Sequence, residues 1–216
     1  MSEFKKIGLE ENLILAVEKM GFETPSEVQS KTVPILLEKD TDLVALAQTG
    51  TGKTAAFGFP MIQKIDINSK KTQGLILSPT RELCLQITNE LKQYGQFYKG
   101  LNITAIYGGA SITDQARSVK KGSQIIVATP GRMKDMINRK LVNISEIKYS
   151  VLDEADEMLN MGFYEDITDI LSFTPKEKNT WLFSATMPKE VSNIARKFMS
   201  SPVEITVGTK NAVSYT

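Results

Sequence analysis

The sequence predicts one α/β domain in which helices flank a mostly parallel central sheet. Two observations predict this fold class. Short runs of apolar, β-branched residues recur along the 216-residue chain, and amphipathic stretches of helical length separate them. Most of the runs are continuously apolar, as strands are when helices cover both faces of a parallel sheet. The repeated alternation of strand and helix therefore favours a single doubly wound sheet.

Seven runs are the predicted strands, and four amphipathic stretches are the predicted helices between them. The strands are expected at 43–48, 74–79, 103–108, 125–130, 149–154, 180–185 and 203–208. The helices are expected at 81–98, 111–121, 132–140 and 188–200. Several strands end in small or polar tails: QTGTGKT, SPTRE, YGGAS, ATPGR, DEAD and SAT. Because ligands bind at the carboxyl ends of the strands in open α/β sheets, these tails should converge on one edge.

The composition excludes several kinds of chemistry. The chain has no histidine, and Cys84, expected to be a small buried residue, is its only cysteine. Ser-His-Asp and Cys-His nucleophiles, intrachain disulfides and zinc sites of the usual ligand types are therefore excluded within this chain. The formal charge is +1, so any nucleic-acid binding must come from local groups. Because no apolar run is long enough for a membrane span and no secretory signal is present, we expect a cytoplasmic protein without membrane contact.

The segment AQTGTGKT (47–54) follows a predicted strand and opens a helix. Its glycines let successive backbone N–H groups point at phosphate oxygens, and the helix N-terminus favours anions. Lys53 should reach the outer phosphates, and the Thr54 hydroxyl can ligate Mg²⁺. The alternative is a glycine-rich turn with a chance Lys-Thr pair, and the order of strand, loop and helix favours the phosphate loop. The expected nucleotide-binding residues of this loop are Thr49, Gly50, Thr51, Gly52, Lys53 and Thr54.

The segment VLDEAD places acidic residues at the end of another buried strand. Asp153 is expected to hold the Mg²⁺ that also touches the phosphates, and Glu154 to accept a proton from an attacking water. The metal and Lys53 would supply the positive charge that keeps these carboxylates ionised. A solvated acidic helix start is the alternative, because carboxylates favour the first helical turn. The catalytic candidates are thus Lys53, Asp153 and Glu154, while Glu157 is expected to be a surface charge.

Seven motifs in order resemble the DEAD-box family of ATP-dependent RNA helicases, specifically the N-terminal RecA-like domain of that family. They are GFETPSEVQ (21–29), AQTGTGKT (47–54), PTREL (79–83), GG (108–109), TPGR (129–132), DEAD (153–156) and SAT (184–186). The resemblance implies a RecA-like phosphate-loop NTPase domain over 1–208, with 209–216 beginning a linker to a second RecA-like domain absent from this chain. It also implies ATP and Mg²⁺ as cofactors and RNA duplex unwinding or remodelling by the joined domains.

The resemblance assigns roles outside the phosphate loop. Gln29 would read the adenine edge with Phe22 against the base. A carboxamide can pair with the amino group and N7 of adenine together, although a helix-capping glutamine is the alternative. Asp156, Ser184 and Thr186 would link the nucleotide site to domain closure. The residues that resemble RNA-backbone contacts, with ordinary strand-to-helix turns as the alternative, are Pro79, Thr80, Arg81, Gly108, Gly109, Thr129, Pro130, Gly131 and Arg132.

Two other functions compete with half of an RNA helicase. A RecA-type ATPase acting on DNA would share the phosphate loop, but GFETPSEVQ and TPGR weigh against it. A non-enzymatic nucleotide-binding scaffold would have no use for a base such as Glu154 beside the metal. By resemblance the chain lacks the arginines that the second domain brings to the phosphates. We therefore expect a monomeric fragment that binds ATP, hydrolyses it negligibly alone, and contacts RNA through its backbone without sequence specificity.

Overall fold

Seven parallel strands form one sheet in the computed structural model, which describes residues 2–208. Their order across the sheet is β3 (Ile103–Ile106), β4 (Ile125–Ala128), β2 (Gly74–Leu77), β5 (Tyr149–Leu152), β6 (Asn179–Ser184), β1 (Leu43–Leu46) and β7 (Val203–Thr206). Every neighbouring pair is parallel. The predicted fold class is confirmed. The predicted linker at 209–216 lies outside the described residues.

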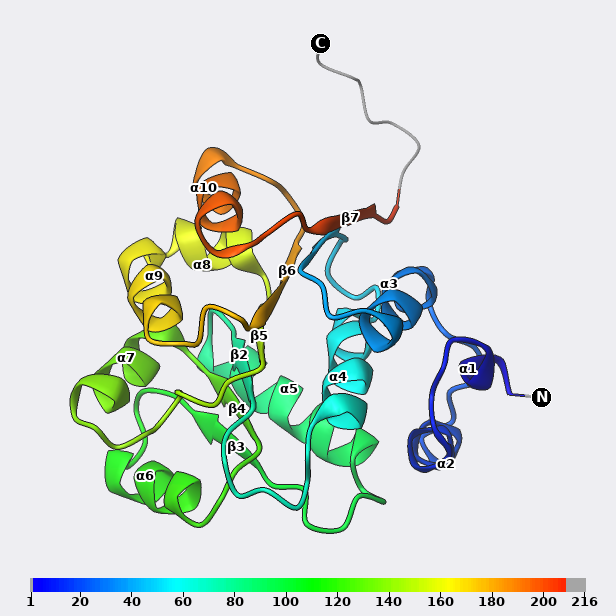
Figure 1. The fold of residues 1–216 in the computed structure, drawn as a ribbon, viewed down its shortest axis with the longest axis horizontal. Coiled ribbons are helices and arrows are strands. Elements are labelled where there is room, and N and C mark those ends of the chain that lie inside the picture. Colours follow the sequence, from blue (N-terminus) through cyan, green and yellow to red (C-terminus); the bar gives the residue numbers. More distant parts are fainter. Residues whose placement is uncertain (1, 209–216) are drawn as a thin grey trace.

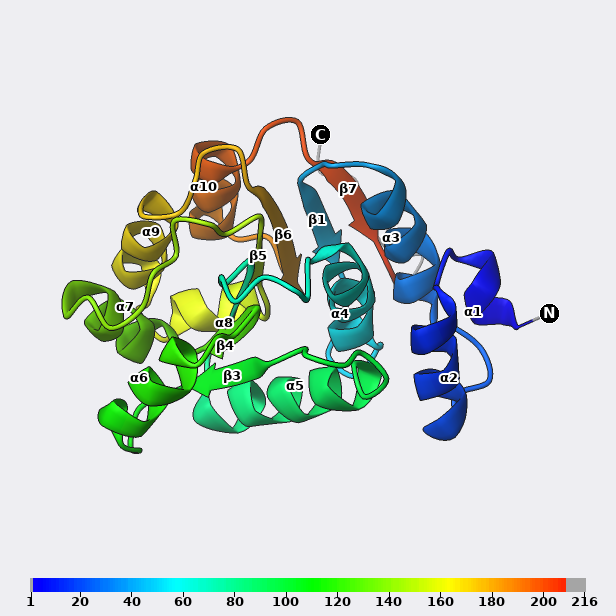
Figure 2. The ribbon, with the colours of Figure 1, turned by 60° about the horizontal axis from the view of Figure 1, so that its bottom comes forward.

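Helices cover both faces of the sheet, as Figures 1 and 2 show. The first group is α1 (Glu3–Lys6), α2 (Glu11–Lys19), α3 (Glu27–Glu38), α4 (Lys53–Lys64) and α5 (Arg81–Tyr94). The group on the opposite face is α6 (Ile112–Lys120), α7 (Pro130–Asn138), α8 (Ala155–Asn160), α9 (Tyr164–Ser172) and α10 (Lys189–Phe198). No helix within residues 2–208 has the length and apolar character needed to cross a bilayer.

Alternating side chains of each strand feed two cores. On β6, Trp181 and Phe183 join the core beneath α1 to α5, whereas Leu182 joins the core beneath α6 to α10. Phe183 meets Phe57 of α4 edge to face, with 5.3 Å between ring centroids. Full burial of side chains of this size contributes about 1.5–3 kcal/mol each. The continuous apolar runs are explained by this burial on both faces.

The predicted elements exist, but several bounds differ. β1 and β5 end at Leu46 and Leu152, before the polar tails, because those tails leave the sheet to form loops and helix starts. The helix expected at 132–140 begins at Pro130, whose fixed φ suits the first helical turn. The sequence pattern predicts no bounds for α2, α3, α8 or α9.

The strand order divides the carboxyl edge of the sheet into two neighbouring parts. β1, β5 and β6 are adjacent, so the phosphate loop, the DEAD segment and the SAT segment leave the sheet side by side. β2, β3 and β4 are adjacent as well, and they carry PTREL, GG and TPGR at their ends. The predicted convergence of the polar tails is therefore confirmed, with the tails in two groups.

Candidate functional site

The phosphate loop connects β1 to α4 through two glycines with left-handed backbone. Gly50 has φ +82° and Gly52 has φ +91°, a region that side chains disfavour. A Cβ on Gly52 would lie 2.5 Å from Gln29 Nε2 and 2.8 Å from Ser26 Oγ, whereas a Cβ on Gly50 would meet nothing within 4 Å. Gly52 is thus required both by its backbone and by the side chains packed against it.

Lys53 joins the phosphate loop to the DEAD segment. Its side chain is only 5% exposed, and its Nζ donates a hydrogen bond of 2.7 Å to Glu154 Oε1. The Thr49 hydroxyl donates to the same oxygen at 3.3 Å. The structure therefore brings together residues predicted from two separate motifs, at the ends of β1 and β5. Thr54 follows in the first turn of α4.

Glu154 has an unusual backbone conformation. It is the N-cap of α8 with φ +52° and ψ +50°, which costs a non-glycine residue about 1–2 kcal/mol. Its backbone N–H donates to Asp153 Oδ1 at 3.0 Å. Strain of this kind concentrates at functional sites. Glu157 is exposed, so the surface position predicted for it is confirmed.

Asp153 is the buried carboxylate of the site, with 3% exposure. Burial raises its pKa from 3.8 to about 7; Lys53 lowers it, and Glu154 raises it. A bound cation beside this carboxyl group would favour its ionised form. Asp153 and the hydroxyl of Thr54 supply the oxygen ligands that a hard cation prefers.

The residues fit a magnesium site that depends on a nucleotide. Within residues 2–208, no group of three or more histidine, cysteine, aspartate or glutamate side chains is arranged to hold a metal ion by itself. Mg²⁺ is commonly held by one or two carboxylates together with substrate phosphates and water. A single buried Asp153 near a phosphate loop agrees with that pattern.

Gln29 caps α3 and also holds the phosphate loop. Its Oε1 accepts from the Ser26 backbone N–H at 3.1 Å, while its own backbone N–H donates to Ser26 Oγ at 3.4 Å. Its Nε2 donates to the Gly52 carbonyl at 3.2 Å. The helix-capping alternative is therefore observed. One N–H and one lone pair of the carboxamide stay available for a nucleobase.

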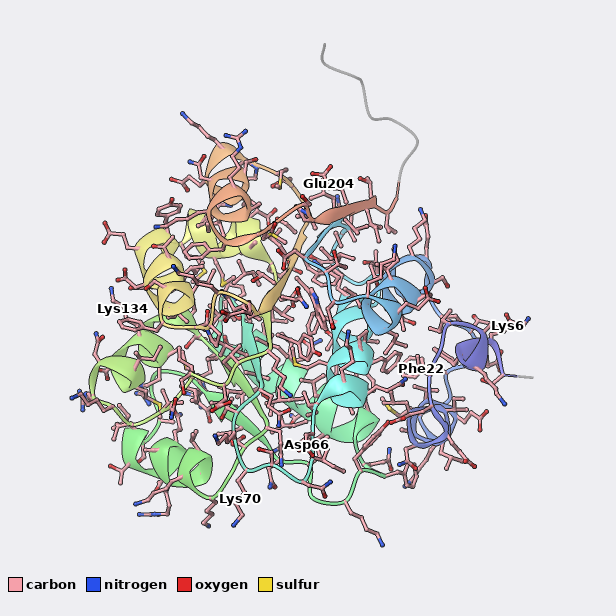
Figure 3. All side chains as sticks on the ribbon, in the orientation of Figure 1. Lys6, Phe22, Asp66, Lys70, Lys134 and Glu204 are labelled. Carbon is pink, nitrogen blue, oxygen red and sulfur yellow. The ribbon has the colours of Figure 1, made fainter. Side chains whose placement is uncertain are left out.

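A pocket of about 330 Å³ lies beside the phosphate loop. Phe22 is 47% exposed at this pocket, which Phe4 and Glu90 also line. Figure 3 shows Phe22 in the region between α2 and α4. An exposed aromatic ring next to Gln29 provides an apolar surface and hydrogen-bonding groups at one place, which suits a nucleobase.

Asp156 links the end of β5 to the end of β6. Its Oδ2 accepts from the Thr186 hydroxyl at 2.8 Å and from the Thr186 N–H at 3.1 Å, and its own N–H donates to Ser184 Oγ at 3.1 Å. Burial raises the pKa of Asp156, but hydrogen bonding with the side chains of Thr186 and Ser184 outweighs burial and lowers the pKa from its ordinary value. The three residues predicted to act together are in contact.

The loop of PTREL meets the loop that contains the two glycines. The guanidinium carbon of Arg81 lies 5.1 Å from the centroid of the Tyr107 ring, and a Cβ on Gly109 would lie 3.4 Å from Arg81 Nη1. Thr80 caps α5, its hydroxyl accepting from Leu83 N–H at 3.2 Å. Arg81 is exposed, and among residues 2–208 it forms no salt bridge. Its charge is available to a ligand.

Gln115 joins this loop to TPGR, a role that the sequence did not indicate. Arg132 Nη1 donates to the Ala110 carbonyl at 3.0 Å and to Gln115 Oε1 at 3.2 Å. The carboxamide of Gln115 also bonds both backbone groups of Tyr107. A Cβ on Gly108 or Gly131 would meet nothing within 4 Å, so both glycines face open space. No local pattern in the sequence marks Gln115, because its role depends on contacts of α6 with Tyr107 and Arg132 in other segments.

Cys84 is fully buried, as expected, with its Sγ near the carbonyls of Val127 and Ile106. Burial raises the pKa of its thiol to about 11, so the thiolate is scarce at neutral pH. The buried position and high pKa make a nucleophilic role at the site unsuited to this residue.

A parallel sheet, a glycine-rich loop before a helix, and a lysine paired with an acidic strand end define a phosphate-loop nucleotide-binding domain. The chain belongs to the DEAD/DEAH box helicase family, whose family model matches residues 26–194. The motifs that carried the resemblance lie within or beside this match.

Relatives and solved structures agree with the family. The ATP-dependent RNA helicase CshA of Listeria monocytogenes is 50% identical over 210 residues, which are 97% of this chain and 40% of that protein. The Geobacillus kaustophilus DEAD-box ATP-dependent RNA helicase CshA is 46% identical, with 97% and 44% covered. A crystal structure of a DEAD box protein from Methanococcus jannaschii has a TM-score of 0.91 at 42% identity, covering 95% of this chain and 56% of that one. The chain spans about two fifths of the curated relatives it matches.

Proposed function

We propose that this chain is the ATP-binding half of an ATP-dependent RNA helicase core. The observation that carries the proposal is the contact of Lys53 Nζ with Glu154 Oε1 at 2.7 Å beside the buried Asp153. A cation suited to bind phosphate and a carboxylate suited to act as a base are thus in contact, which supports the proposal. The relatives named above carry ATP-dependent RNA helicase in their names, which supports the same activity for the whole protein.

Nucleotide binding requires Lys53 to exchange partners. In the structure, its ammonium and the Thr49 hydroxyl both bond Glu154 Oε1. Phosphate oxygens compete for these donors, which frees the carboxylate of Glu154 to accept a proton from water. Thr54 and Asp153 would hold Mg²⁺, which when bound neutralises charge on the transferred phosphoryl group.

Gln29 would connect base recognition to the phosphate loop. Its Nε2 bonds the Gly52 carbonyl, directly before Lys53. Adenine offers an amino group and N7 to a carboxamide, whereas guanine offers two acceptors on that edge. Pairing with adenine would therefore hold the side chain that also fixes the loop. We propose adenine nucleotides as the ligands on this basis.

The second half of the activity would come from residues outside this chain. Charge clamps supplied by arginines are worth about 10³–10⁵ in rate in phosphate-loop enzymes. The network of Asp156 with Ser184 and Thr186 is suited to link such a clamp to the nucleotide. Arg81 and Arg132 would contact RNA phosphates, which carry no sequence information. We therefore expect weak, salt-sensitive RNA binding by this chain alone.

Steady-state ATP hydrolysis tests the proposal. We expect negligible turnover by this chain, with or without single-stranded RNA, and RNA-stimulated turnover when the second domain is present on its natural linker. Robust RNA-stimulated turnover by this chain alone would contradict the half-enzyme proposal. Stimulation of the full-length protein by DNA instead of RNA would favour the DNA-acting alternative, and no turnover under any condition would favour a scaffold.

A further inference from the structure

A second pocket, of about 680 Å³, opens at the amino ends of β1 and β6, at the sheet edge opposite the phosphate loop. We refer to it as the amino-edge pocket. Part of its lining is apolar and comes from Leu171 of α9 and from Phe198 and Met199 at the end of α10. Lys176 and Lys197, both exposed, line it as well. None of the motifs discussed above contributes a residue to this pocket.

Lys178 is the unusual member of the lining, because its side chain is charged yet the residue is only 8% exposed. Its Nζ donates to the Pro175 carbonyl at 3.3 Å and lies 5.9 Å from the centroid of the Phe198 ring. Among residues 2–208 no carboxylate oxygen lies within 4.0 Å of it. An ammonium has three donors, so two of them have no protein acceptor within residues 2–208. Burial lowers the pKa of Lys178, against the opposing influence of Asp42 and Glu177.

The acidic groups of the pocket are mostly satisfied elsewhere. Both carboxylate oxygens of Asp42 accept backbone N–H groups, from Thr180 at 2.7 Å and from Ser200 at 2.6 Å. Asp40 pairs with Lys64 at 2.9 Å. Backbone N–H groups do not neutralise Asp42, so Asp42 and Glu177 remain to balance the three lysines of the lining. The lining keeps one excess positive charge, and its buried cation, Lys178, favours an anionic ligand.

The positions of the lysines are not fully explained by the helix ends. Lys197 lies in the last turn of α10, where a cation interacts favourably with the helix dipole. Lys178, however, lies outside any helix, immediately before β6. Burying its ammonium without a carboxylate costs free energy, which a carboxylate from a ligand would recover.

We propose that the amino-edge pocket binds an acidic segment of a partner protein, with a carboxylate on Lys178 Nζ and a large apolar side chain against Leu171 and Phe198. A pocket of about 350 Å³ adjoins it, shares Lys178 and Asn179, and reaches Lys148. An extended peptide could follow both pockets, whereas a single small anion would use one.

Two other occupants fit less well. The lining contains the carboxylates of Asp40, Asp42 and Glu177 as well as the lysines, which disfavours the continuous phosphates of RNA. The second alternative occupant is another segment of this chain. A segment after β7 would have to reach the pocket from the opposite edge, because β7 runs parallel to β1 and ends at Thr206 on that edge. Positive charge beside an apolar wall, interrupted by carboxylates, is complementary to a peptide that carries both acidic and apolar side chains.

The test uses amide NMR spectra of this chain titrated with a blocked peptide of alternating glutamate and phenylalanine. We expect shifts of the Lys178, Asn179 and Ser200 amides, and no such shifts with the peptide in which glutamine replaces glutamate. Lys178→Met keeps the apolar stem and should weaken binding at least tenfold, because a hydrogen bond between charged groups is lost. Lys120→Met, an exposed change on α6, should leave the affinity unchanged.

Two further controls keep the test decisive. Lys197→Glu changes an exposed residue and should weaken peptide binding severalfold even if Lys178→Met folds poorly. ADP binding at the opposite edge checks that each variant is folded. The proposal is overturned if millimolar glutamate peptide shifts none of these amides, if the glutamine peptide binds equally, or if Lys178→Met and Lys197→Glu bind normally. It is overturned as well if single-stranded RNA shifts these amides more strongly than the peptide does.

Discussion

The two parts of the carboxyl edge use charge in opposite ways. At the ends of β1, β5 and β6, which we term the nucleotide half, Lys53 and Asp153 are buried and Lys53 is paired with Glu154. At the ends of β2, β3 and β4, where we propose RNA contacts and which we term the RNA half, Arg81 is exposed over Tyr107, and Gly108 and Gly131 face open space. The same sheet edge thus carries one largely buried site, whose side chains are hydrogen-bonded to one another, and one open surface.

This difference has consequences for substitutions. Electrostatic interactions are strong where water is excluded, so each group in the nucleotide half depends on its neighbours. Exposed cations are screened by salt and act almost independently. Single changes should therefore have large effects in the nucleotide half, and small, salt-dependent effects in the RNA half.

The largest effect is expected for Glu154→Gln in the full-length protein. The amide keeps the shape of the side chain but cannot accept the proton, so ATP turnover should fall by about 10²–10⁴-fold while ATP still binds. The matched control is Glu157→Gln, an exposed change in the same segment. Normal turnover by Glu154→Gln would exclude Glu154 as the general base.

The next effect separates the two glycines of the phosphate loop. Gly52→Ala should weaken ADP binding and lower the free energy of unfolding by about 1–3 kcal/mol, because its Cβ meets Gln29 and Ser26 at a positive φ. Gly50→Ala has the same kind of φ but meets nothing, so it should cost less. Thermal melts and ADP titrations measure both. Equal losses of stability and ADP affinity in the two variants would show that backbone strain alone causes them. The contact with Gln29 would then not matter.

A smaller effect concerns base choice. The chain should prefer ADP to GDP by about tenfold or more in the presence of Mg²⁺, since a bidentate pair is worth roughly 1–3 kcal/mol. Gln29→Ala should reduce this preference and also loosen the loop at Gly52. Calorimetric titration of both nucleotides gives the ratio. An unchanged ratio in the variant would mean that Gln29 only caps α3.

The smallest effect is expected in the RNA half. Arg81→Ala should weaken binding of single-stranded RNA by a few-fold and reduce the salt slope of log K by about 1, whatever the RNA sequence. Arg196→Ala, an exposed change on α10, is the control. Binding is measured by fluorescence anisotropy at several salt concentrations. A loss restricted to particular sequences would point to base contacts instead of phosphate contacts.

Much of this division could be predicted from the sequence, because it depends on local patterns. Continuous apolar runs indicate strands covered on both faces, and each motif follows such a run. What could not be predicted depends on contacts between distant segments. The pairing of Lys53 with Glu154, and the hydrogen bond from Arg132 to Gln115, bring together side chains whose spacing in sequence has no period. The buried Lys178 was missed for the same reason, because its ammonium lies near the ring of Phe198 on the separate helix α10.

Amide NMR spectra of this chain, recorded separately with ADP and Mg²⁺ and with single-stranded RNA, test the division of the edge most directly. The account predicts that ADP shifts the amides of 49–54, 153–154 and Gln29, whereas RNA shifts those of 80–81, 108–109 and 131–132. Overlapping sets of shifted amides, or RNA shifts centred on the phosphate loop, would contradict two separate sites on one sheet edge.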